Sequence, residues 1–254
     1  MIASQRYEKI VEMVEKKGIV NTKEMARAMD VTETTIRRDC EELEKQGKLI
    51  RVHGGAKRVG EGSHPSEKEE KDFWGSQEHY EEKCQVCKRA ADFVREGDCI
   101  FLDEGTTTVL MLQYLKGKSI KIVTHNLLVA EAFREMDLDA ELFLIGGRYI
   151  KEFNMSVGPV ALGDLSRFNF DHAFLGCAGV DMDRQVAYTT EVETMMIKEK
   201  AMSQSSENYL LMDSSKLTMK GFYSFRKTKD FDAILCNDCE ALRQMDVPEN
   251  IIVI

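Results

Sequence analysis

The segment Val31-Thr-Glu-Thr-Thr-Ile-Arg-Arg-Asp39 has the pattern of an amphipathic helix with hydroxyls and arginines on its outer side. Thr32 is a good N-cap for such a helix. Ile36, Cys40 and Leu43 repeat at i, i+4 and i+7, so they form one apolar stripe. The sequence therefore predicts a helix that is held by this stripe and presents its other side to solvent.

The outer side of this predicted helix carries side chains that can read DNA. Arginine can grip guanine N7 and O6 with two hydrogen bonds, and threonine can touch a thymine methyl group or a phosphate. The first turns of a recognition helix are the ones that meet base edges. The residues on or near this side are Glu33, Thr34, Thr35, Arg37 and Arg38.

Two more helices are predicted before this segment. The first has apolar residues at i, i+3, i+4 and i+7, namely Tyr7, Ile10, Val11 and Val14. It ends at Gly18, and the second begins near Asn21 or Thr22, either of which is a good N-cap. The second helix turns three residues inward, Met25, Ala26 and Met29. Two short helices joined by a short turn make a helix-turn-helix arrangement.

A basic β-hairpin is predicted after Gly47. Apolar and basic residues alternate over 48–53, and Gly54-Gly55 then turns the chain toward Lys57 and Arg58. Such a wing suits the phosphate backbone of DNA. The alternative, a solvated charged face, explains the two arginines but not the whole combination. The predicted DNA contacts are Thr22, Thr32, Thr34, Thr35, Arg37, Arg38, Arg51, His53 and Lys57.

Charge is distributed unevenly along the chain. Residues 1–58 carry 13 Lys and Arg against 10 Asp and Glu, whereas the remainder carries 22 against 34. A DNA-binding head on an acidic body has this asymmetry. We predict a winged helix-turn-helix domain at 1–58, a linker of flexible composition at 59–76 and an α/β domain at 77–254.

The sequence predicts a cytoplasmic protein without a membrane segment. The first ten residues lack the apolar core of a signal peptide, and no apolar run approaches membrane-spanning length. The seven cysteines are odd in number and lie mostly in apolar segments, so we expect reduced thiols. Two Cys-x-x-Cys pairs, at 84–87 and 236–239, have the spacing of half a zinc site, but they lie far apart, and we expect no metal.

The body alternates strand-like runs with amphipathic helices. A helical pattern over 81–95, with Gly97 as its stop, precedes the first of them. The strand-like runs are 99–102, 120–123, 141–145, 172–175, 209–212 and 233–235. Such alternation predicts a mainly parallel sheet covered by helices on both faces.

Polar residues follow these strands, at the edge where open α/β sheets bind ligands. The threonines after Gly105 open a helix through Leu115 and suit an anion, Lys216 supplies a cation, and Asp103 and Asp213 can accept bonds from sugar hydroxyls. No Walker loop and no G-x-G-x-x-G follows a strand, which disfavours a nucleotide. The predicted ligand residues are Asp103, Gly105, Thr106, Thr107, Thr108, Thr124, His125, Asn126, Gly146, Gly147, Gly176, Asp213 and Lys216.

Each of these loops also has a structural interpretation. The threonines and Asp213 can cap helices, and Gly146-Gly147 can form a tight turn. His125 can contact a ligand or be a satisfied structural histidine, and its sequence leaves both open. Several polar loops on one edge of one sheet nevertheless favour a binding site.

The chain resembles the DeoR-type regulators over nearly its whole length. The head carries the resemblance in 31–39 and in Arg51-Val-His-Gly-Gly-Ala56; Cys40 stands where leucine is common. The body carries it in Asp103-x-Gly-Thr-Thr-Thr108, Gly146-Gly147, Gly158, 171–181, Thr189-Thr190 and Asp213-Ser-Ser-Lys216. The resemblance implies a body that is similar in fold to ribose-5-phosphate isomerase and binds a phosphorylated sugar, with Glu193 and Lys198 at matching acidic and basic positions. His125, where asparagine is usual, and 186–188 depart from the family pattern.

These observations predict a transcriptional repressor of a carbohydrate-use operon. Its partners are double-stranded operator DNA, a sugar-phosphate effector and further copies of itself, because two heads would read two half-sites. We expect no cofactor. The alternatives are a sugar-phosphate isomerase that uses Asp103, Glu193 or Lys216 for proton transfer, and a regulator whose effector is not phosphorylated.

Overall fold

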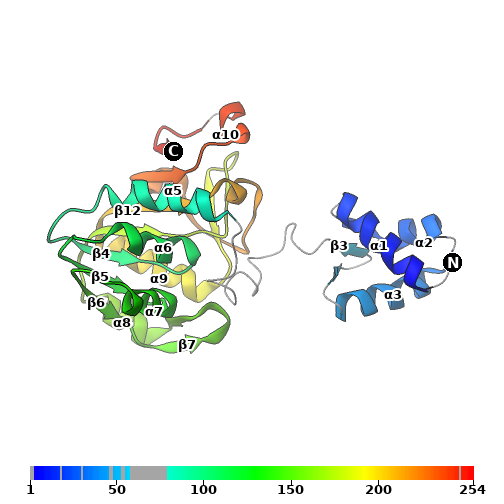
Figure 1. Ribbon diagram of the computed structural model, residues 1–254, viewed down its shortest axis with the longest axis horizontal. Helices are drawn as coiled ribbons and strands as arrows, with labels where there is room; N and C mark the ends of the chain where they lie inside the picture. The colour runs from blue at the N-terminus through cyan, green and yellow to red at the C-terminus, as the bar shows by residue number, and fades with distance from the viewer. Residues whose placement is uncertain are drawn as a thin grey trace. The chain divides into compact units, whose positions relative to one another are not determined.

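The chain forms two compact units, Met1–Ser63 and His64–Ile254 (Figure 1). The computed structural model describes residues 3–17, 19–29, 31–45, 48–52, 55–57, 79–245 and 247–254. The whole predicted linker at 59–76 and the turn at 53–54 therefore lie outside the described residues. In the described part of the chain, no helix has both the length and the apolar character needed to cross a membrane.

The smaller unit is a three-helix bundle with a small antiparallel sheet. Its elements are α1 Ala3–Lys17, β1 Ile19–Asn21, α2 Thr22–Met29, α3 Glu33–Lys45, β2 Ile50–Val52 and β3 Gly55–Lys57. Ile10, Met25 and Ile36, one from each helix, are fully buried. The predicted helix-turn-helix is confirmed, and β2 and β3 pair as the predicted hairpin. β1, which pairs with β3, was not predicted because three residues are too few to show a period.

The larger unit is built on a seven-stranded sheet in the order β15-β14-β12-β9-β4-β5-β6, in which every paired strand is parallel. The strands are β4 Cys99–Leu102, β5 Ile120–Thr124, β6 Ala140–Leu144, β9 Phe170–Leu175, β12 Ser205–Met212, β14 Ala233–Cys236 and β15 Ile251–Val253. Six of the seven were predicted within a few residues, and the prediction of a parallel α/β sheet is confirmed.

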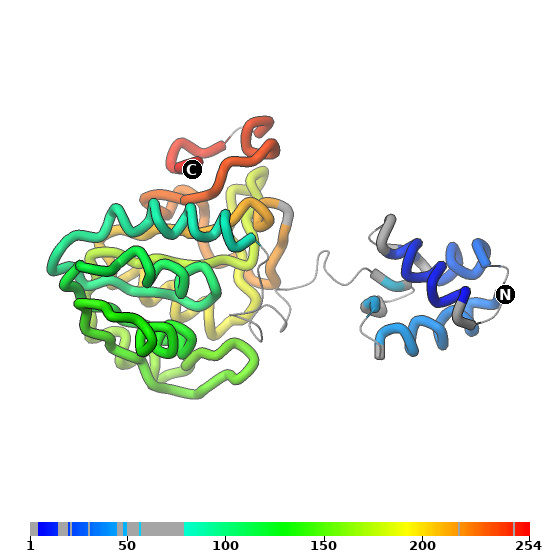
Figure 2. Tube along the Cα trace, viewed as in Figure 1, coloured from blue at the N-terminus to red at the C-terminus, as the bar shows by residue number. Residues whose placement is uncertain are grey.

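Helices cover both faces of this sheet (Figures 1 and 2). Ile100 and Leu102 of β4 pack with one group of helices, whereas Phe101 faces the other. The first group is α5 Tyr80–Ala91, α6 Thr106–Met111 with the short helix η1 Leu112–Tyr114, and α7 Leu127–Glu135. The second group is α8 Pro159–Leu165, α9 Val192–Ser203 and α10 Glu240–Gln244. α5 ends at Ala91, earlier than predicted, and turns lead from it to Gly97.

The larger unit also contains two small antiparallel sheets and three short helices that follow strands of these sheets or of the main sheet. The strands are β7 Arg148–Ile150, β8 Met155–Val157, β10 Gly179–Asp181, β11 Val186–Thr189 and β13 Tyr223–Lys227. The short helices are η2 Lys151–Phe153, η3 Ser214–Thr218 and η4 Thr228–Asp230. These five strands were not predicted, because each is short and lies between loops.

Two glycines allow the segment after η3 to lie against β10 and β11. A Cβ atom on Gly179 would overlap the carbonyl of Met219. A Cβ atom on Gly221 would lie 2.6 Å from the carbonyl oxygen of Thr189. Both approaches are closer than non-bonded atoms allow, so a side chain at either position would require the neighbouring backbone to move.

Candidate functional site

The outer side of α3 presents the side chains that were predicted to read DNA. Thr34, Arg37 and Arg38 are exposed, and the Arg37 side chain keeps 66% of its accessible surface. Arg37 lies only 3.9 Å from Glu33 one turn earlier. Such an exposed ion pair is weak, so the Arg37 guanidinium can exchange it for a base or a phosphate.

The N-terminal end of α3 is fixed by contacts from its neighbours. Arg6 of α1 holds Asp39 at 2.7 Å, and both side chains are largely buried. The hydroxyl of Thr32 accepts a hydrogen bond from the Thr35 amide at 3.2 Å, which confirms Thr32 as the N-cap. These contacts set the direction in which the two arginines leave the helix.

The remaining predicted DNA contacts divide into two groups. Thr22 is 5% exposed and lies 3.3 Å from Glu33 through its hydroxyl, so its described role is to connect α2 with α3. Arg51 and Lys57 lie in β2 and β3, and their side chains are outside the described residues. His53 also lies outside the described residues.

A pocket lies at the carboxyl ends of β4, β9 and β12, which are neighbours in the main sheet. Its cavity volume is about 90 Å³, which is room for several water molecules. Two lysines, five threonines and one carboxylate contribute to its wall beside apolar groups. The lining residues are Lys83, Glu104, Gly105, Thr106, Thr107, Phe153, Met155, Gly176, Cys177, Ala178, Thr189, Thr190, Thr194, Leu211, Met212 and Lys216.

Five of the predicted ligand residues lie on this wall: Gly105, Thr106, Thr107, Gly176 and Lys216. The first three come from the loop after β4 and the start of α6, and Gly176 follows β9. Lys216 comes from η3, after β12. The polar residues that follow the predicted strands therefore identified the edge of the sheet at which the pocket lies.

Three other predicted residues are fully buried and hold the loops in place. The Thr108 hydroxyl donates to the Asp103 carbonyl at 2.7 Å, and the Thr124 hydroxyl donates to the Leu102 carbonyl at 2.7 Å. Asn126 caps α7 by accepting a hydrogen bond from the Leu128 amide at 2.9 Å. Their polar groups are engaged inside the protein, behind the pocket wall.

Four further predicted ligand residues do not line the pocket: Gly146, Gly147, Glu193 and Asp213. A Cβ atom on Gly147 would lie 2.7 Å from the Val157 carbonyl oxygen, so this glycine permits close packing. Glu193 forms an ion pair with Arg148. Asp213 is 1% exposed and caps η3 through the Ser215 amide at 3.0 Å.

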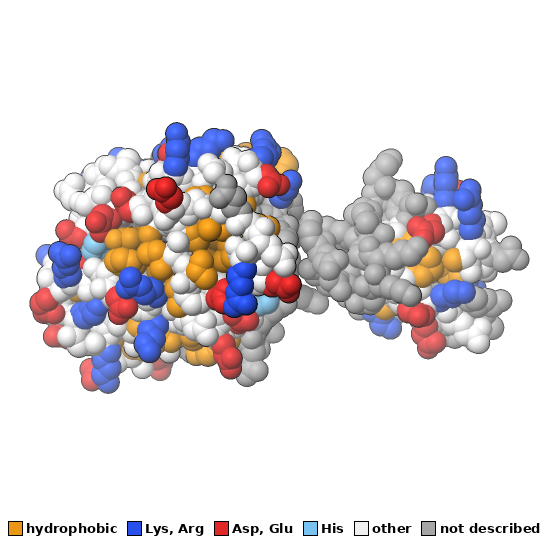
Figure 3. Space-filling model, turned by 90° about the horizontal axis from the view of Figure 1, so that it is seen from above, with side chains coloured by type: hydrophobic (Ala, Val, Ile, Leu, Met, Phe, Trp, Pro, Cys, Tyr) orange, Lys and Arg blue, Asp and Glu red, His pale blue; other side chains and the backbone are white. Residues whose placement is uncertain are grey.

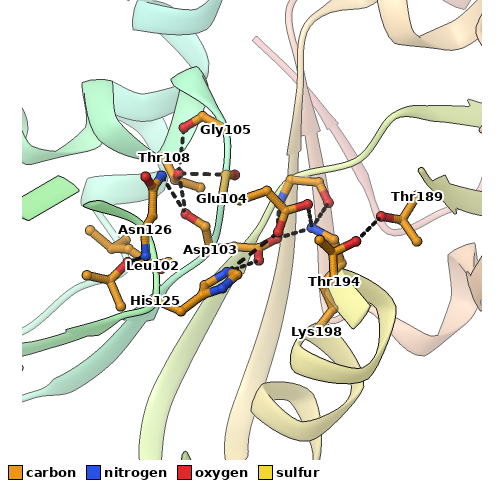
Figure 4. Close-up of polar contacts among 12 residues, drawn as sticks. Leu102, Asp103, Glu104, Gly105, Thr108, His125, Asn126, Thr189, Thr194 and Lys198 are labelled. Atoms are coloured by element: carbon orange, nitrogen blue, oxygen red, sulfur yellow. Dashed lines mark hydrogen bonds and ion pairs between the residues drawn. The ribbon is translucent and has the colours of Figure 1, made fainter. Parts of the chain in front are cut away.

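Behind the wall lies a buried charge cluster of Asp103, Glu104, His125 and Lys198 (Figure 4). The Lys198 ammonium contacts Asp103, and it lies 2.7 Å from Glu104 and 3.1 Å from the Gly176 carbonyl oxygen. Asp103 also accepts a hydrogen bond from the Gly176 amide at 2.9 Å. The cluster thus joins the loop after β4, the loop after β9 and helix α9.

The charges of this cluster support one another. Burial alone would raise the pKa of Asp103, but the Lys198 charge together with the His125 and Glu104 side chains outweighs burial and lowers that pKa below its ordinary value. Burial would lower the pKa of Lys198, but Asp103 and Glu104 raise it. Burial and the neighbouring Asp103 charge raise the pKa of Glu104. Asp103 and Lys198 are therefore charged at neutral pH.

His125 completes the cluster from the end of β5. Its Nδ1 lies 3.0 Å from the Ser156 carbonyl oxygen, which can only accept, so Nδ1 carries a proton. Its Nε2 faces Asp103 at 3.4 Å and Glu104 at 3.6 Å, so Nε2 is the nitrogen that titrates. Burial would lower the pKa of His125, but the two carboxylates raise it to about 9. His125 is fully buried, and both of its ring nitrogens face protein groups.

Asp103, Glu104 and His125 also have the donor types and spacing of a metal site, the one such group among the described residues. Lys198 contacts both carboxylates of this group, so a positive charge already lies between them.

Cys87 donates to the Thr107 carbonyl oxygen at 2.9 Å, and this thiol therefore links α5 to α6.

Several wall residues were missed by sequence reasoning. Glu104, not its neighbour Asp103, faces the pocket. Lys83 of α5 is 8% exposed and lies four residues before Cys87 on the apolar stripe of that helix. A lysine that interrupts an apolar stripe was a usable signal, whereas nothing local marked Phe153 or Met155.

Two family descriptions match the chain. Residues 6–61 match the DeoR-like helix-turn-helix domain, and residues 78–238 match the DeoR C terminal sensor domain. The second match alone spans more than half of the chain.

Curated relatives align over nearly the whole chain. The uncharacterized HTH-type transcriptional regulator FruR of Bacillus subtilis is 31% identical, over 100% of this chain and 98% of its own. A lactose phosphotransferase system repressor of Staphylococcus epidermidis is 32% identical, over 95% of each chain. Among solved structures, ribose 5-phosphate isomerase A of Methanocaldococcus jannaschii aligns with a TM-score of 0.40 and 17% identity, over 55% of each chain.

Replacement of His125 by asparagine is expected to change how stability depends on pH. The raised pKa of His125 means that the folded protein holds this proton more tightly than the unfolded chain does. Its stabilising contribution is therefore complete below the unfolded pKa of about 6.5 and is lost as pH rises through about 9. Asparagine cannot contribute in this way. The free energy of unfolding of the parent protein should thus fall, relative to His125→Asn, by about 3 kcal/mol at most across this range.

The measurement is denaturant unfolding of both proteins between pH 6 and pH 9.5, roughly the window set by the two pKa values. His79→Asn serves as the control, because His79 has a φ of 56°, which asparagine tolerates. Parallel stability profiles for the parent protein and His125→Asn would show that the pKa of His125 is the same in the folded and the unfolded protein.

Proposed function

Because this chain belongs to the DeoR family of transcriptional regulators, we propose that it represses a carbohydrate-use operon and responds to a phosphorylated sugar. The smaller unit binds operator DNA, and the pocket of the larger unit binds the effector. One observation carries this proposal: a helix with exposed arginines and a sheet-edge pocket lined by lysines and threonines occur in the same chain.

The DNA part of the proposal rests on α3. Thr34, Arg37 and Arg38 are exposed on a helix whose opposite side is fully buried. Bidentate arginine contacts to guanine supply sequence discrimination, and the hairpin of β2 and β3 is the wing that follows the phosphate backbone. Lactose phosphotransferase system repressors are among the relatives, and we extend their class, a carbohydrate-use repressor, to this chain.

Arg37→Ala and Arg38→Ala are expected to lose operator discrimination. If each guanidinium grips a guanine, each substitution costs about 1–3 kcal/mol on the specific site and little on random DNA. Lys57→Ala should instead weaken binding to all sequences and flatten the salt dependence, because it contacts a phosphate. Fluorescence anisotropy on a duplex selected from a random library measures both quantities.

Arg134→Ala is the matched control for these variants. It removes a 76% exposed arginine from the larger unit and should leave both affinities unchanged. Equal losses on the selected and the random duplex for Arg37→Ala and Arg38→Ala would exclude a base-reading role for both residues.

We also propose that the protein acts as a homo-oligomer. Two helix-turn-helix heads read two half-sites one helical turn apart, which matches a closed two-fold assembly. Apolar side chains gather on the face of the larger unit in Figure 3, among charges of both signs. The exposed apolar residues of this unit include Val160 at 64% and Phe222 at 70%. Burial of such residues between copies would stabilise an oligomer.

A footprint on the selected duplex is expected to cover two related half-sites. Their centres should lie about 10 base pairs, or a small multiple of this, apart, because both heads must face the same side of the duplex. Hydroxyl-radical protection measures the spacing. Protection of a single unrepeated half-site would contradict the two-headed assembly.

The effector part of the proposal rests on the chemistry of the pocket wall. Lys83 and Lys216 supply cations, and Thr106 and Thr107 supply hydroxyls and amides at the start of α6. These groups donate hydrogen bonds, which phosphate oxygens accept. The Glu104 carboxylate also lines the pocket, and its side chain keeps 17% of its accessible surface. A carboxylate at this position can accept a hydrogen bond from a sugar hydroxyl.

The enzymatic alternative receives no support from this geometry. Asp103 is fully buried and bound to Lys198, so it cannot exchange protons with a ligand in the pocket. Glu193 pairs with Arg148 away from the wall. Of the three residues that an isomerase was expected to use, only Lys216 lines the pocket.

Replacement of both Thr106 and Lys216 by alanine is expected to weaken effector binding tenfold or more, because at least one charge-assisted hydrogen bond of about 1.5–3 kcal/mol is lost. A thermal-shift titration with fructose 1-phosphate, fructose 6-phosphate, galactose 6-phosphate and the free sugars measures this, since a ligand raises stability according to its concentration over its Kd. Lys116→Ala is the control, because Lys116 is an exposed lysine that follows α6 and η1 in sequence. An undiminished response of the double variant would exclude a phosphate at these residues.

A further inference from the structure

Lys83 is the wall residue that connects the pocket to the start of the larger unit. It lies in the first turn of α5 and is 8% exposed. α5 is the first helix described after β3 (Figure 2). The pocket therefore contacts the first described helix of the larger unit.

The first turn of α5 is linked to the pocket at two points. The Lys83 side chain lines the pocket together with Thr106, Thr107 and Lys216. One turn later, the Cys87 thiol donates to the Thr107 carbonyl oxygen at 2.9 Å. Ligand atoms held by Thr107 and Lys83 would thus be bound by α6 and α5 together.

The beginning of α5 has no side-chain cap among the described residues. The Lys83 amide donates to the carbonyl oxygen of His79, the N-cap residue, at 3.0 Å. His79 has a φ of 56°, and its side chain makes no capping hydrogen bond within the described residues. A helix end without a side-chain cap opens more readily than the helix interior, so a ligand on Lys83 can change its stability.

We infer that Lys83 binds the anionic group of the effector and thereby fixes the first turn of α5, which makes it the residue that passes pocket occupancy toward the DNA-binding unit. This inference rests on the proposed function. It commits the pocket to a ligand whose phosphate lies between Lys83 and Lys216, with its hydroxyls toward Glu104.

The physical requirement for such coupling is a difference in affinity. A ligand changes an equilibrium between two arrangements only if it binds one of them more tightly. An arrangement with an ordered first turn of α5 offers the Lys83 ammonium to the phosphate, and one with an open first turn does not. Effector binding therefore favours the ordered turn by the contribution of this single contact.

Lys83→Met tests the inference, because methionine keeps much of the side-chain length and apolar contact but removes the charge. We expect the affinity for whichever of the three sugar phosphates stabilises the parent protein to fall about tenfold or more. Affinity for the matching free sugar should change little. Lys83→Arg, which keeps the cation, should restore much of the loss, and Lys88→Met, an exposed lysine of the same helix, is the matched control.

Amide hydrogen exchange supplies the readout that separates coupling from mere binding. In the parent protein, the same sugar phosphate should slow exchange at the amides of residues 83–87 several-fold, since it stabilises the first turn. In Lys83→Met at saturating ligand, this protection should be absent, and operator affinity should no longer respond to the ligand. The unliganded variant should unfold at the denaturant concentration of the parent protein, which excludes misfolding as the cause.

Each other result has one meaning. If no sugar phosphate of the panel stabilises the parent protein, the proposed function fails and the inference fails with it. If the parent protein binds one and Lys83→Met binds it equally well and remains responsive, the pocket assignment stands and the inference about Lys83 is overturned. If Lys83→Met loses affinity but the parent protein shows no protection at residues 83–87, the coupling through α5 is overturned.

Discussion

The buried ion pair between Asp103 and Lys198 is the interaction on which the larger unit depends. The two residues are 95 positions apart, and both are fully buried. A buried charge without its partner is strongly destabilising, so the loop after β4 and helix α9 must come together whenever the unit folds. Gly176, which donates to Asp103 and accepts from Lys198, adds the loop after β9. The pocket wall is the outer surface of these same loops, so its shape follows from the pair behind it.

The sequence was informative where the structure is governed by local patterns. Six strands of the main sheet were predicted because buried parallel strands are continuous apolar runs, and the polar residues after them located the edge of the sheet that forms the pocket. The sequence was less informative about the direction in which individual side chains point. Asp103 and Glu104 are neighbours with similar chemistry, and both contact Lys198, yet only Glu104 also lines the pocket. Tertiary partners such as Lys198 decide this, and they lie too far away in sequence to be recognised.

The smaller unit was predicted more completely for the same reason. Its helix ends, apolar stripes and hairpin are all set by residues a few positions apart. Thr22 is the instructive exception. It was predicted as an N-cap candidate and as a DNA contact, whereas its hydroxyl donates to Glu33 at the start of the next helix, a partner that no local pattern indicated. Lys83 shows the converse, since a charge on an apolar helix stripe indicates a buried polar environment even when its partners are unknown.

The close packing at Gly179 and Gly221 limits how this protein can diverge in evolution. Any side chain at either position would force the backbone of Met219 or Thr189 to move, and Thr189 belongs to the pocket wall. Descendants of this chain can therefore acquire a new ligand preference by exchanging wall side chains at the strand ends, where substitutions leave the backbone in place. The contact between the segment after η3 and strands β10 and β11 cannot change in this way, and glycine should be retained at both positions.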